Sequence, residues 1–182
     1  MNDLTEKTLS QTTPFQGRLL RLRVDQALLP DGTTAGREVV EHPGGVGVLA
    51  LTEDRKVLLV RQYRYPYGEV LTEIPAGKRD PGEEPLVTGM RELEEETGYR
   101  ANCFTPLGKV YPSPGYCDEI IYLYLATDLV AAEAHPDADE VLDVERRDLE
   151  VLAQQVLDGQ ITDAKTQIAV LKAYQLLNRK DD

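Results

Sequence analysis

Four glutamates lie within five positions of one stretch of the chain, and this cluster is the strongest chemical signal in the sequence. Glu92, Glu94, Glu95 and Glu96 stand at the end of a segment that has the signals of a helix. Negative charge is unfavourable at the C-terminal end of a helix, and acids three or four positions apart repel each other by roughly a few tenths of a kcal/mol per pair. Arg91 is the only cation within reach. A divalent cation held between these acids would make the arrangement favourable.

The spacing of Glu92, Glu95 and Glu96 suits such a cation. Positions i, i+3 and i+4 of a helix project from one face about a turn apart. Hard cations such as Mg²⁺ take oxygen ligands, keep several waters and often share their site with substrate phosphates. The alternative is a solvated acidic helix face, which is the usual meaning of a run of charges. The acids alone favour that alternative, so the decision depends on the residues around them.

The segment before the acids has the features of a loop followed by a helix. Pro85 suits the first helical turn and Gly98 suits the position just after the last one, so we expect a helix over about 84–97. Ahead of it, Pro75-Ala76-Gly77 and Asp80-Pro81-Gly82 mark a loop and a turn. The acids therefore gather near the end of a loop–helix–loop unit.

The rest of the chain is expected to supply strands first and helices last. Residues 1–14 are expected to be loose. The expected strands cover residues 17–29, 35–41, 45–51, 56–62, 69–74, 105–111, 119–127 and about 141–144. One amphipathic helix is expected from Asp148 to Gly159, and another from Thr162 as a candidate N-cap. This order predicts an α/β protein with a mixed sheet flanked by helices, preceded by an N-terminal antiparallel hairpin or small sheet.

Composition limits the classes of function. The 182 residues are 41% apolar, enough for a real core, and carry a net charge of −12. Such an acidic chain is unsuited to nonspecific binding of nucleic acid or of an anionic membrane. Cys103 and Cys117 form no CxxC pair, and the polar N-terminus has no apolar signal core. We therefore expect a protein of the reducing cytoplasm.

Residues 77–99 as a whole resemble the Nudix box, G-x5-E-x7-R-E-U-x-E-E-x-G-U, in which U is apolar. All seven fixed letters are present: Gly77, Glu83, Arg91, Glu92, Glu95, Glu96 and Gly98. Tyr99 occupies a final position that is more often aliphatic. The resemblance implies a Nudix-type α/β/α sandwich and cleavage of a nucleoside diphosphate linked to another group.

Further segments resemble the ADP-ribose pyrophosphatase subfamily along nearly the whole chain. They are REVVEHP at 37–43, VRQYR at 60–64, EIPAG at 73–77, SPGYCDE at 113–119 and DAKT at 163–166. Pro114 stands where the subfamily usually has a marker proline. One departure is the glycine at positions 45 and 47, where relatives more often have alanine. Glycine in a strand allows a close approach of neighbouring backbone.

The resemblance also implies metal ligands. The ions would be held by the carboxylates of Glu92, Glu95 and Glu96 and by the backbone carbonyl of Ala76. Arg91 would orient the carboxylates through charge-assisted hydrogen bonds, and Glu83 would have a structural or outer role. The expected cofactor is Mg²⁺, for which Mn²⁺ or another divalent cation can substitute.

The candidate substrate-binding residues are Arg37, Glu38, Arg64, Glu73, Ser113 and Gly115. Guanidinium groups suit phosphate oxygens, although either arginine could instead form a surface salt bridge. The two glutamates could accept hydrogen bonds from the base or the ribose hydroxyls, or could simply pair with an arginine. The serine and the glycine are expected to line the substrate through backbone groups.

The reaction implied is Mg²⁺-assisted hydrolysis of the pyrophosphate of ADP-ribose to AMP and ribose 5-phosphate. Bound ions would neutralise the phosphates and lower the pKa of a water that attacks phosphorus. In the subfamily the general base is often a glutamate on a loop between the last strands. This predicts Glu140, with Glu95 as the second choice, although the sequence around Glu140 is also typical of a solvated loop.

The subfamily commonly forms homodimers in which the N-terminal sheet reaches over the partner's site. Residues 1–42 are therefore expected to form a β subdomain for dimerisation and substrate binding, and residues 43–182 the hydrolase domain. Phe15 is the only aromatic residue before Tyr63, so adenine is expected against aliphatic groups such as Leu19 or Leu20.

Three alternatives remain open. One is the same chemistry on GDP-mannose or another nucleotide sugar. Another is a non-catalytic sensor that binds ADP-ribose and regulates a partner. The third is an acidic metal-binding or structural protein, which does not explain the complete box.

Overall fold

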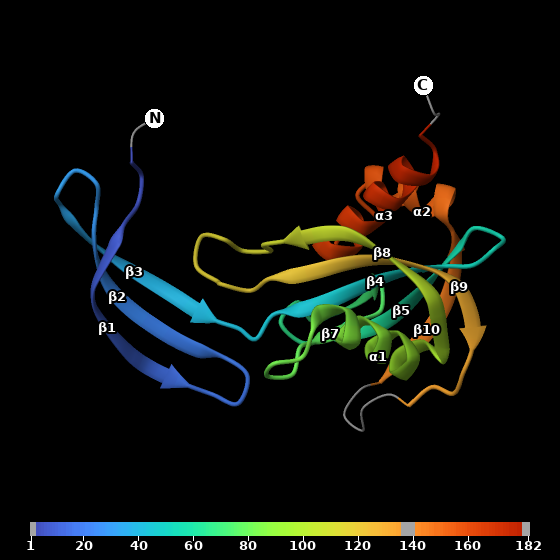
Figure 1. Cartoon of the computed structure of the whole chain (residues 1–182), viewed down its shortest axis with the longest axis horizontal. Coiled ribbons are helices and arrows are strands. Elements are labelled where there is room, and N and C mark those ends of the chain that lie inside the picture. Colours follow the sequence, from blue (N-terminus) through green and yellow to red (C-terminus); the bar gives the residue numbers. More distant parts are fainter. Residues whose placement is uncertain (1–2, 136–140, 180–182) are drawn as a thin grey trace. The chain divides into compact units, whose positions relative to one another are not determined.

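Two compact units make up the chain in the computed structural model, which describes residues 3–135 and 141–179 (Figure 1). The smaller unit combines Met1–Gly44 with Tyr111–Ile120, and the larger one combines Gly45–Val110 with Ile121–Asp182. A stretch from the middle of the sequence is therefore part of the N-terminal unit.

The larger unit is built on a seven-stranded sheet. Its strands are β4 (Gly45–Leu51), β5 (Lys56–Arg64), β6 (Glu69–Glu73), β7 (Ala76–Lys78), β8 (Tyr99–Val110), β9 (Ile121–Ala131) and β10 (Leu142–Asp148). The main order is β10-β5-β4-β9-β8, with β6 beside β5 and β7 beside β4. Strands β4 and β9 run parallel, whereas the other neighbours run antiparallel. The sheet is mixed, as predicted.

Helices cover both faces of this sheet: α1 (Pro85–Thr97) lies on one, and α2 (Leu149–Leu157) and α3 (Ala164–Leu177) lie on the other (Figure 1). Alternate residues of the central strands pack against the helices on opposite faces of the sheet. Leu49 and Leu59 belong to the core cluster that includes α2 and α3, whereas Val48 and Leu58 pack in the cluster with Leu93 of α1. Every residue of β4 is buried, as expected for a strand between two helical layers. The predicted α/β/α sandwich is confirmed.

The smaller unit is a three-stranded antiparallel sheet in the order β1-β2-β3. Its strands are β1 (Lys7–Gln16), β2 (Arg21–Leu28) and β3 (Thr34–Glu41). The predicted N-terminal sheet is confirmed, but the expectation that residues 1–14 are loose is wrong, because β1 begins at Lys7. The polar sequence of β1 gives no hydrophobic signal, and its threonines suit a strand once β2 supplies the hydrogen bonds.

The segment 111–120 joins this unit through β3. The backbone N–H of Val40 donates to the carbonyl of Tyr116 at 2.7 Å, and the N–H of Asp118 donates to the carbonyl of Val40 at 3.1 Å. The carboxylate of Asp118 also accepts from the backbone N–H of His42 at 2.8 Å. The SPGYCDE motif is thus tied to the REVVEHP strand, two segments that sequence analysis had treated separately.

Several element boundaries differ from the predictions. Strand β8 starts at Tyr99 rather than at residue 105, because antiparallel pairing with β9 extends through its polar first half. Strand β7 was not predicted. The N-cap of α3 is Asp163 and not Thr162, since the Asp163 carboxylate accepts from the N–H of Thr166.

Two further observations concern the expected environment of the protein. No helix in the described part of the chain is both long and apolar enough to cross a membrane. Cys103 and Cys117 are free thiols. The cytoplasmic location stays a prediction.

Candidate active site

Helix α1 is amphipathic, and the face that packs on the sheet carries two of the acids. Its first turn contains Pro85, and its end is fixed by Gly98, whose φ of 70° is the left-handed conformation that glycine adopts easily. Glu92 and Glu96, one turn apart, are buried on the side that faces the sheet, at 8% and 3% exposure. Glu94 points elsewhere and pairs with Arg100, so the expectation that Arg91 is the only cation within reach of the four acids is wrong. The helix therefore separates one surface acid from those of the cluster.

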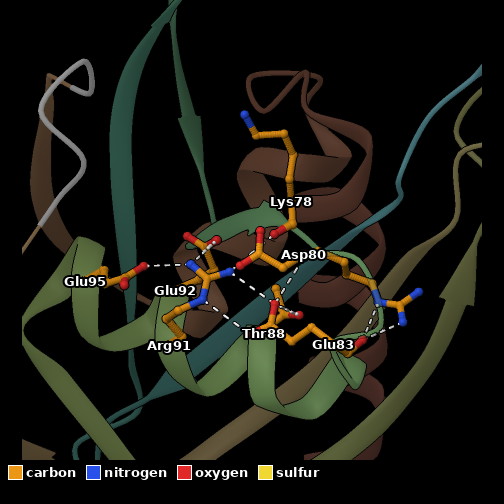
Figure 2. Close-up of polar contacts among 8 residues, drawn as sticks. Lys78, Asp80, Glu83, Thr88, Arg91, Glu92 and Glu95 are labelled. Carbon is orange, nitrogen blue, oxygen red and sulfur yellow. Dashed lines mark hydrogen bonds and ion pairs between the residues drawn. The ribbon is translucent and has the colours of Figure 1, made fainter. Parts of the chain in front are cut away.

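Arg91 lies at the centre of the acidic cluster (Figure 2). Its Nη1 donates to Glu92 Oε1 and to Glu95 Oε2, both at 2.8 Å. Its Nη2 donates to Glu83 Oε2 and to the carbonyl of Lys78, both at 3.3 Å. Burial alone would lower the pKa of Arg91, but these carboxylates outweigh it and raise the pKa above its ordinary value. The geometry matches the predicted contact between Arg91 and the acids.

Glu83 is held as firmly as the acids of the helix. Its carboxylate accepts from the guanidinium of Arg91, from the hydroxyl of Thr88 at 2.8 Å and from the backbone N–H of Asp80 at 3.2 Å. These contacts, that of Arg91 first, lower the pKa of Glu83 to about 2. Glu83 thus fixes both the loop before α1 and the guanidinium that orders the other acids.

The strand β7 lies against the same acids. A Cβ atom built on Gly77 would be only 1.9 Å from the carboxyl carbon of Glu92, so the glycine leaves room for that carboxylate. The backbone N–H of Ala76 donates to Glu96 Oε2 at 3.0 Å. The loop before the helix and the acids at its end therefore meet at Ala76 and Gly77.

The donor set fits a hard divalent cation. Three carboxylates, those of Glu83, Glu92 and Glu95, contact the guanidinium of Arg91, and Glu96 lies one helical turn from Glu92. Oxygen-only sites of this charge suit Mg²⁺ or Mn²⁺. Within residues 3–135 and 141–179, no three acidic, imidazole or thiol side chains converge as a metal site. Arg91 Nη1 contacts one oxygen of Glu92 and one oxygen of Glu95.

A second polar cluster lies where β5, β6 and the start of α3 meet. Glu73, only 1% exposed, accepts from Arg64 Nε at 2.6 Å and from Arg64 Nη2 at 2.7 Å, and it also pairs with Lys165. Burial alone would raise the pKa of Glu73, but the two cations outweigh it and the pKa lies below its ordinary value. Of the two expectations for these residues, the arginine–glutamate pair is the one observed.

The smaller unit has an open pocket of about 580 Å³. Its lining includes Arg37, Glu38 and Gly115, three of the predicted substrate-binding residues, together with Tyr111 and Tyr116. The guanidinium of Arg37 pairs with Glu6 through contacts of 2.9 and 2.7 Å. The lining of the pocket thus includes residues of β1, of β3 and of the segment 111–120.

The predicted residues therefore fall into three groups. The first group comes together around α1 and consists of Arg91, Glu92, Glu95, Glu96 and Ala76. The second is the ion pair of half-buried Arg64 with buried Glu73. The third, Arg37, Glu38 and Gly115, lines the pocket. The carbonyl of Ser113 accepts from the N–H groups of Tyr116 and Cys117 and so holds the turn. Glu140 lies outside the described residues, and its role stays a prediction.

The two tyrosines of the pocket are not among the predicted residues, because the prediction for adenine concerned only the segment before Tyr63. The signal was available, since Tyr111 and Tyr116 flank the SPG motif. Lys165 and Thr166 are likewise predicted only as part of a helix start, although both contact the segment before Ala76.

The two glycines that depart from the subfamily pattern lie close to other groups. A Cβ atom on Gly45 would be 3.0 Å from the carbonyl oxygen of Gly77, and one on Gly47 would be 3.0 Å from Ile74 Cδ1. Both positions thus serve the tight packing of β4 against the 74–77 segment.

Comparison with known proteins places this geometry in a family context. The profile described as "NUDIX domain" matches residues 41–168, and that described as "Nucleoside diphosphate sugar hydrolase N-terminal domain" matches residues 6–40. The chain is 42% identical to the "ADP-ribose pyrophosphatase" of Bacillus subtilis (strain 168), over 93% of each chain.

Two other similarities extend over nearly the full length. The "Methanol dehydrogenase activator" of Bacillus methanolicus is 46% identical over 96% of this chain and 97% of its own. The fold matches that in "Crystal structure of ADP compounds hydrolase" with a TM-score of 0.85, 23% identity and 97% coverage of both chains.

Proposed function

The chain belongs to the Nudix family, and on that premise we propose that it uses Mg²⁺ to hydrolyse the pyrophosphate of ADP-ribose to AMP and ribose 5-phosphate. The observation that carries this proposal is the acidic cluster at the end of α1. Two of its members, Glu92 and Glu96, are buried against the sheet, where Arg91 and the N–H of Ala76 compensate part of their charge. A bound divalent cation would compensate the rest. The substrate choice is supported by the 42% identity to the Bacillus subtilis ADP-ribose pyrophosphatase.

In the proposed mechanism Glu92, Glu95, Glu96 and the carbonyl of Ala76 hold the metal. When bound, divalent cations neutralise phosphate oxygens and lower the pKa of a coordinated water. Arg91 keeps the carboxylates of Glu92 and Glu95 directed to one place through its two 2.8 Å contacts. Because the chain carries a net charge of −12, an anionic substrate would be repelled by the protein without cations at this position.

The pocket of the smaller unit is the proposed site for the sugar or base of the nucleotide. Its lining includes the aromatic Tyr111 and Tyr116, the carboxylate of Glu38 as an acceptor for hydroxyl or amino groups, and Arg37. The Arg37 guanidinium would exchange Glu6 for a phosphate. Two tyrosines make this pocket a better candidate for a purine than the aliphatic side chains of Leu19 and Leu20, the sequence-based choice.

The test is product analysis with matched variants. Purified protein is incubated with Mg²⁺ and with ADP-ribose, GDP-mannose and other nucleotide sugars, and the products are identified by chromatography and mass spectrometry. We expect AMP and ribose 5-phosphate from ADP-ribose. The variant Glu96→Gln is expected to lose at least about 10²-fold in kcat.

The control is Glu94→Gln, which makes the same charge change on the same helix but affects the surface pair with Arg100. It is expected to keep wild-type turnover. Consumption of GDP-mannose in preference to ADP-ribose would reassign the substrate, and the absence of any turnover would reject the enzymatic proposal.

A homodimer formed through the smaller unit is part of the proposal. All ten residues of β1 are exposed, and this edge strand carries Leu9 and Phe15 at 56% and 58% exposure. An exposed edge strand with apolar side chains is a template for pairing with another strand. A second copy of β1 is the partner that fits best, because a two-fold dimer brings the same surface of both subunits together.

Activation of an alcohol dehydrogenase is a second candidate function, favoured by the 46% identity to the Bacillus methanolicus activator. The measurement is the rate of purified methanol dehydrogenase from that organism with and without this protein. An increase caused by wild type and not by Glu96→Gln would link activation to hydrolysis. An equal increase from both would indicate a non-catalytic regulator, and no increase would remove this candidate.

A further inference from the structure

The first turn of α3 contains a small set of connected polar contacts. Asp163 caps the helix: its Oδ2 accepts from the backbone N–H of Thr166 at 2.9 Å and from the Thr166 hydroxyl at 2.5 Å. Its Oδ1 accepts from Lys165 Nζ at 3.0 Å. The capping carboxylate thus fixes the direction of both side chains that follow it in the same turn.

Both side chains then contact a segment that is distant in the sequence. The Thr166 hydroxyl oxygen accepts from the backbone N–H of Ile74 at 2.8 Å, in a place where both residues are fully buried. Lys165 donates to the carboxylate of Glu73. The helix that lies on the face opposite α1 (Figure 1) therefore holds the chain just before the proposed metal ligand Ala76.

The next two residues of the segment, Pro75 and Ala76, also form hydrogen bonds. The carbonyl of Pro75 accepts from the N–H of Val48 at 2.9 Å. The N–H of Ala76 donates to Glu96 at 3.0 Å, and Gly77 leaves room for Glu92. From Ile74 to Gly77, the backbone is held by β4 and by groups from both helical layers, so its course depends on α3 as well as on α1.

We propose that Thr166, oriented by Asp163, is a positioning residue that sets the backbone of residues 74–76 and thereby the metal-binding carbonyl of Ala76. This inference rests on the proposed function. Thr166 suits the role because its hydroxyl donates to Asp163 and accepts from Ile74 at the same time. An aliphatic side chain of the same shape would fill the space and leave the buried N–H of Ile74 without that acceptor.

The test compares Thr166→Val with Thr166→Ser. Mn²⁺ binding is measured by electron paramagnetic resonance and by titration calorimetry, and kcat and KM are measured with ADP-ribose. We expect Thr166→Val to weaken Mn²⁺ binding by about tenfold, the effect typical of groups that orient metal ligands. We also expect kcat to fall with little change in KM. Thr166→Ser keeps the hydroxyl and is expected to restore both values.

A destabilising control in the neighbouring helix separates positioning from general destabilisation. Val156→Ala removes buried side-chain atoms of an aliphatic residue of α2, which belongs to the same core cluster as residues of α3. It is expected to lower the unfolding temperature and to leave Mn²⁺ affinity unchanged. Equal loss of Mn²⁺ affinity in both variants would overturn the inference.

The remaining outcomes also decide the question. If Thr166→Val does not fold, Asp163→Asn replaces it, because asparagine still caps a helix but weakens the hold on Thr166 and Lys165. Unchanged Mn²⁺ affinity in that variant would overturn the inference. If wild type binds Mn²⁺ and hydrolyses substrate while Thr166→Val equals it, only this inference fails. If wild type does neither, the proposed function fails.

Discussion

At the scale of single residues, the acidic cluster depends on one arginine and one glycine. Arg91 contacts Glu83, Glu92 and Glu95 together, and Gly77 gives Glu92 its space. The spacing of the Nudix box predicted the contact between Arg91 and the acids, because three of the four acids and Arg91 lie on one helix with a fixed repeat. The contact of β7 with the helix could not be predicted from the sequence, since it depends on how β7 pairs in the sheet.

The role of Gly77 predicts the effect of a single methyl group. In Gly77→Ala the new Cβ would overlap the Glu92 carboxylate, 1.9 Å away, and the flexible side chain would turn away from the cluster. We expect metal affinity to fall by about 10–100-fold while the fold is retained, since Gly77 is not in the left-handed region. Mn²⁺ titration and thermal unfolding measure the two effects.

The control for this variant is Gly36→Ala on β3, where a Cβ would meet only a distant side-chain nitrogen of Gln26 at 3.9 Å. It should bind Mn²⁺ as wild type does. Wild-type Mn²⁺ affinity in Gly77→Ala would show that Glu92 is not a ligand.

Glu140, the predicted general base, is tested by the pair Glu140→Gln and Glu133→Gln. A general base contributes about 10²–10⁴-fold to turnover, so Glu140→Gln should lower kcat by that amount and leave KM nearly unchanged. Glu133, an exposed neighbour on the same connection, should tolerate the change. Unaltered kcat in Glu140→Gln would transfer the role to Glu95, the second choice.

At the scale of elements, the prediction from sequence succeeded where the local signal was strong. Helix α1 and strand β4 lie where the proline, the glycines and the apolar run indicated. Strand β1 and the first half of β8 failed, because their polar residues form strands only through pairing with β2 and β9. The contact of Lys165 with Glu73 spans 92 positions and joins α3 to β6, so no local pattern could predict it.

The contact of Lys165 with Glu73 makes the stability of the junction between β5, β6 and α3 depend on pH. Removing one partner of a buried ion pair typically costs about 3–5 kcal/mol, so Glu73→Gln should lower the free energy of unfolding by about that amount at neutral pH. The surface pair of Arg55 and Glu150 gives the control, and Glu150→Gln should cost at most about 1 kcal/mol.

The pH dependence follows from the lowered pKa of Glu73. A carboxylate with a depressed pKa in the folded state contributes stability above its unfolded value of about 4.3. This contribution is lost as the pH falls through the lower folded value. Urea unfolding of wild type and Glu73→Gln should therefore show a difference that is constant near pH 7 and shrinks in acid below about pH 4. A difference independent of pH would reject the ionised pair.

At the scale of the whole molecule, the proposed assembly depends on β1. Lysine on an exposed edge strand opposes strand pairing, so Leu9→Lys should weaken self-association by at least about tenfold, equivalent to about 1.4 kcal/mol. Sedimentation velocity over a concentration series measures the effect. Val151→Lys, the same change at an exposed position of α2, should leave association intact. A wild-type protein that sediments as a monomer would reject the homodimer.

Segment 111–120 is bonded to the N-terminal sheet, and this contact limits which segments can be exchanged between related proteins. Because Tyr116 and Asp118 exchange backbone hydrogen bonds with Val40, the two stretches have to match each other, although about seventy positions separate them in the order of the chain. A chimera that receives a foreign N-terminus alone would present its third strand to an unmatched loop. Swapping both stretches together would keep Tyr111 and Tyr116 in one pocket with Arg37. This double exchange is therefore the one to attempt when specificity is transferred between relatives.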